Sequence, residues 1–403
     1  MKWFLFAWKN VWRNSRRSMT TIMITATGSA AILIFSGYML FTFESLSEMS
    51  ARQYGNVIIS HAKYFEGDEP VPMAYGLDDW RTIQKELKLQ NGVKQVLPRI
   101  HFSGLISNGE KSMVFIGTGV DAEHEFDLQG SFLDVRQGEL LDPEAEVPEV
   151  MLGVDLARSL QAVPGSVLTL LSTTSDGVLN GIDVQLVGMI ATGIPEMDKR
   201  ALTVSLHTAQ ELLITKSVST LSVYLYQTDE TDRARIKIQA DYPTLGIKIW
   251  EDLAFFYHKV RDLYERIFGM MGVIILVVVL LSVANTMSMA VLERTREIGI
   301  MAAMGAPPYQ ILFNFISESM IIGIMGSALG ILMAGGLTLI LPFAEIMMPP
   351  PPGRNVAYPL ILHFSIDVYV VVSVIIVLIT IMGGFMAARK GVKKSIVEAL
   401  AHV

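Results

Sequence analysis

The chain has no cysteine among its 403 residues. This absence excludes a disulfide framework, a thiolate nucleophile and the cysteine-containing zinc sites. Any large domain in this protein must therefore be held together by side-chain packing, even in an oxidising compartment.

Motifs for catalysis and nucleotide binding are also missing. The sequence contains no G-x-x-x-x-G-K-[ST] loop, no H-E-x-x-H pair and no G-x-S-x-G turn, so it offers no phosphate cradle and no recognisable hydrolytic site. One cluster, DAEHEFD at 121–127, contains the potential metal ligands Asp121, His124 and Asp127, but an acidic surface turn that opens a helix is the more common meaning of such a pattern. We predict no catalytic residue, no bound metal and no cofactor in this chain.

Charged residues make up only 18% of the chain, whereas hydrophobic residues make up 51% and the mean hydropathy is +0.43. This balance is too apolar for an ordinary soluble enzyme and indicates a membrane protein with a soluble part. A helix needs about 18 or more nearly uncharged residues to cross the ~30 Å hydrocarbon layer. Four segments qualify, and we predict transmembrane helices at 19–43, 268–292, 311–343 and 366–388.

The first of these segments could instead be the apolar region of a cleaved signal peptide. Its apolar run is longer than such a region, and no A-x-A-like site follows Phe43. We therefore expect a retained membrane anchor.

Lysine and arginine are unevenly distributed around the four segments. They gather in the N-terminal 1–18, in the 293–310 loop and in the 389–403 tail, whereas the 344–365 loop holds only Arg354. The positive-inside rule places both termini and the 293–310 loop in the cytoplasm.

The same rule places the long segment 44–267 outside. Between residues 44 and 265 the chain has 33 acids and 19 bases, and the remainder has 13 bases and 6 acids. A predominantly acidic outer domain, with an excess of bases in the rest of the chain, gives no reason to expect nucleic acid as a partner.

Short β-rich runs and helical stretches alternate in the outer domain without a strict βαβ order, so we predict a mixed α+β domain. We expect strands at 56–60, 113–117, 166–171, 184–190 and 221–226, and helices at 78–88, 154–161 and 205–214.

Two short segments next to the predicted spans, 1–18 and 344–365, have distinctive compositions. In 1–18, tryptophans and other apolar residues interleave with lysine and arginine, which favours an amphipathic elbow helix at the membrane interface over a simple charged flank. The 344–365 loop contains MMPPPPG, and consecutive prolines favour a stiff, extended connector.

A charged decapeptide, LERTREIGIM at 292–301, separates two apolar runs. Each charge would cost roughly 2.5–3.5 kcal/mol at mid-bilayer, so the segment must lie outside the hydrocarbon. On a helix, Glu293 and Glu297 are i,i+4 neighbours and each lies three residues from an arginine, which predicts a self-paired polar face. Such a segment either docks on a soluble partner or is a solvated hairpin tip.

One acid, Glu318, lies about two turns inside the third predicted span. An acid at that depth is costly unless it faces protein, so we expect it to point inward. Pairing with Arg294 or Arg296 and a simple role in helix packing both remain open.

The stretch LERTREIGIMAAMGAPPYQILFNFISESMIIGIMGSALGI resembles the signature of ABC-transporter permeases of the MacB, LolC/LolE and FtsX group. Further blocks, LFAWKNVWRNSRRS, EVMLGVDLARSLQAVPGS, VQLVGMIATG and ARKGVKKSIVEAL, are similar to other parts of these permeases in the same order. The residues that match the signature are Glu293, Arg294, Glu297, Ile298, Gly299, Gly305, Ala306, Glu318, Gly323, Gly326 and Gly330.

The resemblance implies one span, a large periplasmic domain and then three spans, in the inner membrane of a bacterium. It implies a dimer with an identical or homologous permease, and two copies of a separate ATPase that binds ATP and Mg. The coupling contact with that ATPase would be made by Glu293, Arg294, Arg296, Glu297, Ile298, Gly299, Gly305 and Ala306. Close helix packing or a dimer seam would be formed around Glu318, Gly323, Gly326 and Gly330.

Three functions follow from this resemblance. The first is release of lipoprotein or another lipid-like substrate from the membrane, the second is export of a small molecule or peptide with a periplasmic adaptor, and the third is regulation of a periplasmic enzyme without transport. The chain carries no fused ATPase domain, which favours the LolC/LolE layout. Its loop at 172–183 has no proline or arginine, so we expect an ordinary hairpin there rather than a loop that captures a lipoprotein chaperone.

Overall fold

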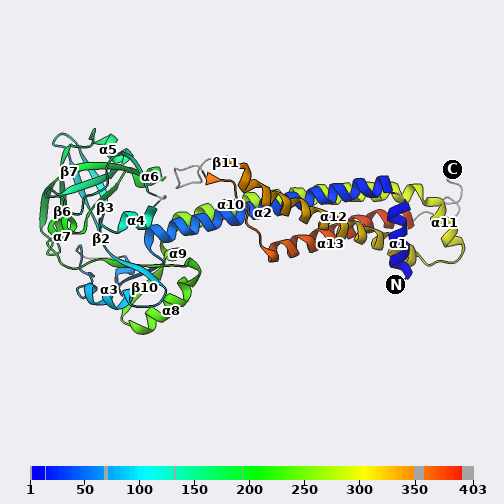
Figure 1. Cartoon of the computed structure of the whole chain (residues 1–403), viewed down its shortest axis with the longest axis horizontal. Helices are drawn as coiled ribbons and strands as arrows, with labels where there is room; N and C mark the ends of the chain where they lie inside the picture. The colour runs from blue at the N-terminus through cyan, green and yellow to red at the C-terminus, as the bar shows by residue number, and fades with distance from the viewer. Residues whose placement is uncertain are drawn as a thin grey trace. The chain divides into compact units, whose positions relative to one another are not determined.

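A computed structural model of the chain describes residues 2–13, 15–67, 71–130, 133–192, 194–348 and 358–392 (Figure 1). Two compact units form. The sheet unit comprises Glu44–Val260 and Met348–Tyr358, and the helical unit comprises Met1–Phe43, Arg261–Met347 and Pro359–Val403. Most of the predicted proline-rich connector, at 349–357, and most of the predicted C-terminal tail, at 393–403, lie outside the described residues.

Four helices among the described residues are long and apolar enough to cross a membrane, which confirms the predicted arrangement of one helix followed by three (Figure 1). They are α2 (Ser15–Tyr54), α10 (Phe255–Glu293), α12 (Pro308–Ala344) and α13 (Ile366–Val392). Two shorter helices accompany them, α1 (Lys2–Arg13) and α11 (Thr295–Ala303).

The elbow helix α1 is amphipathic in the structure. Ala7 and Val11 are buried among apolar residues of α10, α12 and α13, whereas Trp8 and Trp12 are exposed. Tryptophan is favoured at the interface between lipid and water, so the exposed face suits that environment.

Small residues bring the long helices together. A Cβ added to Gly323 would lie 2.4 Å from Oγ1 of Thr380 on α13, and one added to Gly326 would lie 2.7 Å from the side chain of Thr25 on α2. Gly330 meets Ser29 of α2 in the same way. The three glycines are buried in contacts within the chain, so they serve close packing of these helices.

The sheet unit contains ten strands in the order β10-β1-β9-β2-β3-β8-β5-β7-β4, with β6 beside β2 and β7. Two pairs are parallel, β3 with β8 and β5 with β7, and the other pairs are antiparallel. The predicted mixed α+β domain is therefore confirmed. The strands are β1 (Val57–His61), β2 (Val93–Ser107), β3 (Ser112–Val120), β4 (Asp134–Gly138), β5 (Glu149–Gly153), β6 (Val167–Thr173), β7 (Leu179–Ala191), β8 (Ala201–Ser205), β9 (Thr220–Leu225) and β10 (Leu245–Ile249).

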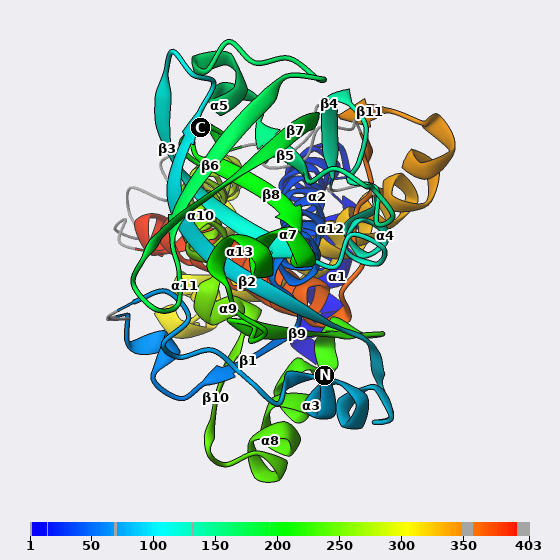
Figure 2. The same ribbon diagram turned by 90° about the vertical axis from the view of Figure 1, so that its left-hand side faces the viewer.

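The longest strand, β2, changes partners half-way along (Figure 2). Residues 93–99 pair with β9 and residues 99–107 pair with β3. Pro98 lies at this change, where its missing N–H removes one ladder hydrogen bond. The sheet therefore has two parts that share one strand.

Helices cover the sheet and complete its core. On β6 alternate residues point inward, with Leu168 and Leu170 buried, as the period of a half-buried strand requires. Ser205 caps the N-terminus of helix α7 (Leu206–Leu213), because its hydroxyl accepts a hydrogen bond from the backbone N–H of Thr208. The remaining helices are α3 (Trp80–Lys88), α4 (Glu125–Gln129), α5 (Val154–Ser159), α6 (Pro195–Asp198), α7 (Leu206–Leu213), α8 (Thr231–Asp241) and α9 (Trp250–Leu253), with 3-10 turns at Tyr64–Glu66 and Thr228–Glu230 and two short strands, β11 (Met347–Met348) and β12 (Tyr358–Pro359).

Candidate functional site

The charged segment between α10 and α12 is not one continuous helix. Helix α10 ends at Glu293, Arg294 occupies a turn, and α11 begins at Thr295. The Thr295 hydroxyl donates to the Leu292 carbonyl at 2.7 Å, so it satisfies a carbonyl at the break. After α11, Gly305 has a φ of +89°, a left-handed conformation that favours glycine.

The break changes the ion pairing that the sequence predicted. Within the segment, Arg294 pairs with Glu297 at 3.1 Å, as expected for residues three apart. Glu293 does not pair with Arg296. Its carboxylate instead accepts a hydrogen bond from Nη1 of Arg17 at 2.5 Å. The self-paired face is thus only half present.

The N-terminal helices supply two cations to this segment. Arg13 donates from Nη2 to both carboxylate oxygens of Glu297, at 3.1 and 3.2 Å, and Arg17 holds Glu293. Burial opposes ionisation of the Glu297 carboxyl, but the hydrogen bond and charge of Arg294, with a contribution from Arg13, outweigh it and lower the pKa of Glu297. Both long-range pairs are exposed in whole or in part, so water screens them and each adds little to stability.

Arg294 also forms a buried ion pair. Its Nη1 lies 3.0 Å from Oε2 of Glu318, and the two side chains are only 11% and 6% exposed. The guanidinium lies over the ring of Phe315, 5.4 Å from its centroid. The inward-facing acid of the third span therefore pairs with Arg294, and Arg296 makes no ion pair with any residue that the structure describes.

The apolar side of α11 is attached to the bundle. Ile298 is buried in a cluster with Val291, Ile311, Phe315 and Ala388, and Gly299 is buried beside it. Gly305 is exposed, and Ala306 is half-buried with its N–H bonded to the Met301 carbonyl at 3.0 Å.

The opposite side of this segment faces away from the protein. Arg296, Ile300, Met304 and Tyr309 are exposed. Arginine, methionine and tyrosine are enriched in protein interfaces. We use the name α11 face for Arg296 and Ile300 of that helix together with Met304 and Tyr309, which follow it in the chain.

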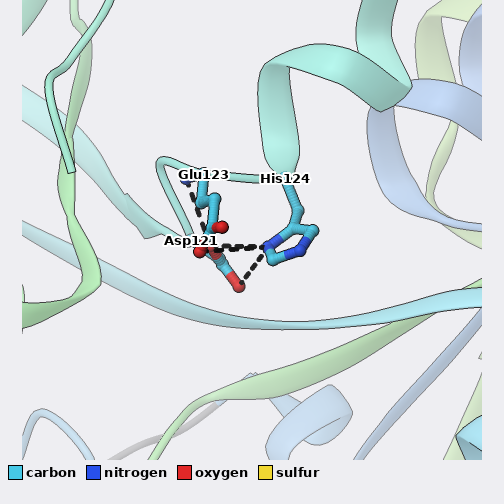
Figure 3. Close-up of side chains that lie close together, drawn as sticks. All are labelled: Asp121, Glu123 and His124. Atoms are coloured by element: carbon cyan, nitrogen blue, oxygen red, sulfur yellow. Dashed lines mark hydrogen bonds and ion pairs between the residues drawn. The ribbon is translucent and has the colours of Figure 1, made fainter.

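The first residues of the acidic cluster, 121–124, form a turn before α4 (Figure 3), and the remaining residues, 125–127, lie in that helix. Nδ1 of His124 lies 3.3 Å from both carboxylate oxygens of Asp121 and 4.0 Å from Oε2 of Glu123, whereas Asp127 is not part of the group. Asp121 also accepts the backbone N–H of Glu123 at 3.2 Å. Its carboxylate thus shapes the turn, which is the structural role expected of an acid at this position.

Two family models match this chain. The MacB-like periplasmic core domain matches residues 18–241, more than half of the chain, and the FtsX-like permease C-terminal domain matches residues 269–396. The chain belongs to the ABC permeases of the MacB, LolC and FtsX type. This permease is accordingly a multi-pass membrane protein, and its relatives are permease subunits.

Three relatives illustrate the range of this family. The ABC transporter permease YtrF of Bacillus subtilis is 36% identical over 135 residues, which are 32% of this chain and 30% of YtrF. The macrolide export ATP-binding/permease protein MacB of Nitrosomonas europaea is 32% identical over 143 residues, 36% of this chain and 20% of MacB. The lipoprotein-releasing system transmembrane protein LolC of Neisseria meningitidis is 21% identical over 276 residues, 63% of each chain.

This permease spans less than two thirds of each of these relatives. Among solved structures, the periplasmic region of MacB from Actinobacillus actinomycetemcomitans overlays on 50% of this chain and 93% of its own, with 14% identity and a TM-score of 0.36.

Proposed function

We propose that this chain is the permease subunit that couples ATP hydrolysis in a separate ATPase to movement of the sheet unit, and that it releases lipoprotein or another lipid-like substrate. In this proposal both termini and α11 lie in the cytoplasm, and residues 44–267 lie in the periplasm of a bacterium. The permease acts as a dimer with an identical or homologous chain, and the two ATPase copies bind ATP and Mg.

The α11 face carries this proposal. The helix is fixed to the bundle through Ile298 and through the buried pair of Arg294 with Glu318. Its exposed side combines apolar side chains with Arg296, which makes no ion pair among the residues that the structure describes. A short helix held firmly on one side can transmit the displacement of a subunit that binds the other side.

The substrate class is supported by the relatives. The alignment with LolC extends over 63% of this chain, whereas the alignment with MacB extends over 36%. A MacB-like export of a small molecule or peptide with an adaptor is the second candidate, since MacB is also a relative. Regulation of a periplasmic enzyme is the third, since the FtsX-like domain is matched.

The β6–β7 hairpin bears on the periplasmic partner. The connection between these strands is a tight turn at 174–178, closed by the hydrogen bond from the Gly177 N–H to the Thr174 carbonyl at 2.9 Å. A turn this short offers little surface, so we assign capture of a lipoprotein chaperone or adaptor to other parts of the complex.

The first experiment reverses the charge of the α11 face. We expect Arg296→Glu to reduce the amount of ATPase that copurifies with the chain from its native membrane by at least about tenfold. A tenfold loss of affinity corresponds to a loss of ~1.4 kcal/mol in binding free energy. Lys9→Glu, the same change at an exposed residue of α1, is the matched control and should have no effect. Equal ATPase yields for Arg296→Glu, Ile300→Glu and the unmodified chain would remove the coupling role.

A second experiment separates internal pairing from contact with the ATPase. Lysine at both Glu293 and Glu297 should abolish association with the ATPase while the chain still inserts in the membrane. The exchange of Glu293→Arg with Arg17→Glu restores the internal pair with opposite polarity. If the exchange restores ATPase stimulation, the carboxylate acts within the permease; if it does not, the carboxylate contacts the ATPase.

The same copurification distinguishes the three candidates. A lipoprotein chaperone among the copurified proteins supports substrate release, an adaptor supports export, and a cell-wall hydrolase supports regulation.

The topology is tested by Arg296→Cys, because the chain has no other cysteine. A membrane-impermeant maleimide should label it in inverted vesicles and not in intact cells.

A further inference from the structure

The sheet unit has an open cavity of about 540 Å³ on its surface. Its walls come from the last turns of α2, the middle of β2 and β3, helix α4, and β8 with the segment before it. Ligand pockets in proteins commonly measure about 300–1,000 Å³, so the cavity is large enough for a small organic molecule.

The lining of the cavity is mainly apolar with a few polar groups. Ile116, which is exposed although it lies on a central strand, lines the cavity together with Phe126 and Ile190. The hydroxyl residues Thr118 and Thr203 lie beside them. An apolar wall with a small number of polar groups is typical of sites for amphipathic ligands.

The deepest charge in the wall is already satisfied. Arg99 is buried with Glu125, and their side chains are 6% and 1% exposed. Arg99 also donates from Nη1 to the Gln53 carbonyl at 2.6 Å and from Nη2 to the Tyr224 hydroxyl at 2.6 Å. This group completes its own hydrogen bonds and offers no net charge to a ligand.

Most other charges around the cavity are paired too. Arg52 binds Glu48 at 2.6 Å, Arg136 binds Asp134 at 2.5 Å, and Lys199 binds Glu196 at 2.8 Å. Arg200 remains: it lines the cavity, is exposed, and makes no ion pair with a residue in the described part of the chain. Lys199 and, more weakly, Arg200 lower the pKa of Glu196, but the Glu196 carboxylate is already bound by Lys199. Arg200 is therefore a positive charge at the cavity wall that is not held in an ion pair with a described residue.

We propose that this cavity binds a small amphipathic anion, with its apolar body against Ile116, Phe126 and Ile190 and its anionic group on Arg200. His101, also in the wall, stays neutral at physiological pH because loss of water around the ring and the nearby Arg99 lower its pKa to about 4. The ligand therefore meets no second cation at that wall.

The site adjoins the end of α2. Residues Met49, Gln53 and Tyr54 of that helix line the cavity, and Arg99 binds the Gln53 carbonyl. A ligand in the cavity contacts the helix end directly and stabilises the arrangement that it binds. This inference does not depend on the ATPase, so it can fail or hold separately from the proposed function.

The test uses the absence of cysteine. A single Thr118→Cys substitution in the full chain, held in phosphatidylcholine nanodiscs, reports on the cavity by its rate of modification with a maleimide. We expect saturating dodecanoate to slow this modification at least fivefold. The rate for Lys111→Cys, an exposed control in the turn between β2 and β3, should be unchanged. Thr203→Cys should behave as Thr118→Cys and shows that the result does not depend on one substitution.

The charge of the ligand is tested in the same system. Arg200→Gln should weaken protection by dodecanoate at least tenfold, and dodecyltrimethylammonium should protect much less than dodecanoate. Protection in nanodiscs that contain phosphatidylglycerol without added dodecanoate would identify a membrane lipid as the source of the anion. Absence of protection at both cysteines, or equal protection by the anionic and cationic amphiphiles, would overturn the proposal.

Discussion

The two units of this permease bury their side chains in different ways. The sheet unit has one large apolar cluster that includes residues from nearly all of its strands. The helical unit has several small clusters, and the apolar window of α10 is only 11% buried, compared with 39% for α2. Lipid solvates apolar side chains, so the helical unit needs no continuous core and depends on close packing and polar pairs instead.

Each unit also contains one buried pair of arginine and glutamate. Arg99 in the sheet unit is bound by Glu125, by a tyrosine hydroxyl and by a backbone carbonyl. Arg294 in the helical unit is bound by Glu318 and by the partly exposed Glu297. The first pair is more completely enclosed, so its loss should cost more than loss of the second.

The largest effect is expected in the sheet unit. Arg99→Met leaves the Glu125 carboxylate buried without a cation, which should lower the free energy of unfolding by about 3–5 kcal/mol. Urea unfolding of the detergent-solubilised chain, followed by protection of sheet-unit fragments from proteolysis, measures this loss. Arg158→Met removes an exposed pair with Asp155 and should cost less than about 1 kcal/mol. Similar losses for the two variants would contradict the comparison.

A smaller effect is expected for the pair in the helical unit. Arg294→Met should destabilise the helices by about 1–3 kcal/mol, less than Arg99→Met, because the pair with Glu318 is less completely enclosed than the pair of Arg99 with Glu125. Protease protection of helical-unit fragments measures the loss, with sheet-unit fragments as the internal control. The companion change Glu318→Gln keeps a hydrogen-bond acceptor and should cost less; a larger loss for Glu318→Gln would show that the pairing is not the main contribution.

Close packing between helices provides the next comparison. Gly330→Leu places a side chain against Ser29, where a Cβ would already lie 2.6 Å from another side-chain carbon, and should cost about 1–3 kcal/mol. Gly335→Leu, on the same helix, meets nothing within 4 Å and should be neutral or slightly stabilising. Thermal unfolding in detergent distinguishes the two, and equal melting temperatures would contradict the assigned contacts.

The smallest effect concerns pH. The pKa of His101 is lowered from 6.5 to about 4 in the folded state, so below pH 6.5 the unfolded chain binds more protons there than the folded chain. Stability from this group is complete above pH 6.5 and is lost as the pH falls toward 4. His101 is exposed at the cavity wall and loses only part of its water, which reduces the effect to a shift in Tm of less than about 4 °C.

His101→Gln removes this contribution. The difference in Tm between the unmodified chain and the variant should therefore change between pH 6.5 and 4 and stay constant above pH 6.5. A constant difference throughout would show that the ring titrates normally.

The sequence contained the local features of this fold. Long apolar runs predicted four membrane helices because span length is a property of the run itself. The expected strand at 113–117 falls within β3, and those at 166–171 and 221–226 overlap β6 and β9 to within one residue, since alternation and turn residues are local. Strand β2 was not expected, because Pro98 and polar residues interrupt its pattern.

The candidate site was only partly accessible from the sequence. The signature residues around Glu293 and Glu297 stood out, but nothing local relates Arg13 to Glu297, which are 284 residues apart in the chain. The break of the helix at Arg294 was also missed, since the charges fit a regular helix equally well. For the cavity, a lone arginine at position 99 between Pro98 and Ile100 in a β-rich run was the available signal, because a charge in such a run needs a buried partner.

The change of partners along β2 has a mechanical consequence. Arg99 is the residue of that strand opposite both Thr220 of β9 and Val120 of β3, and its side chain holds the end of α2 through the Gln53 carbonyl. A displacement of that end of α2 therefore acts on the strand that the two parts of the sheet share, as well as on β9, whose Ser222 hydroxyl donates to the Tyr54 carbonyl at 2.8 Å. One residue inserted after Arg99 would move the remaining pairing by one position and turn the side chains beyond the insertion to the opposite face.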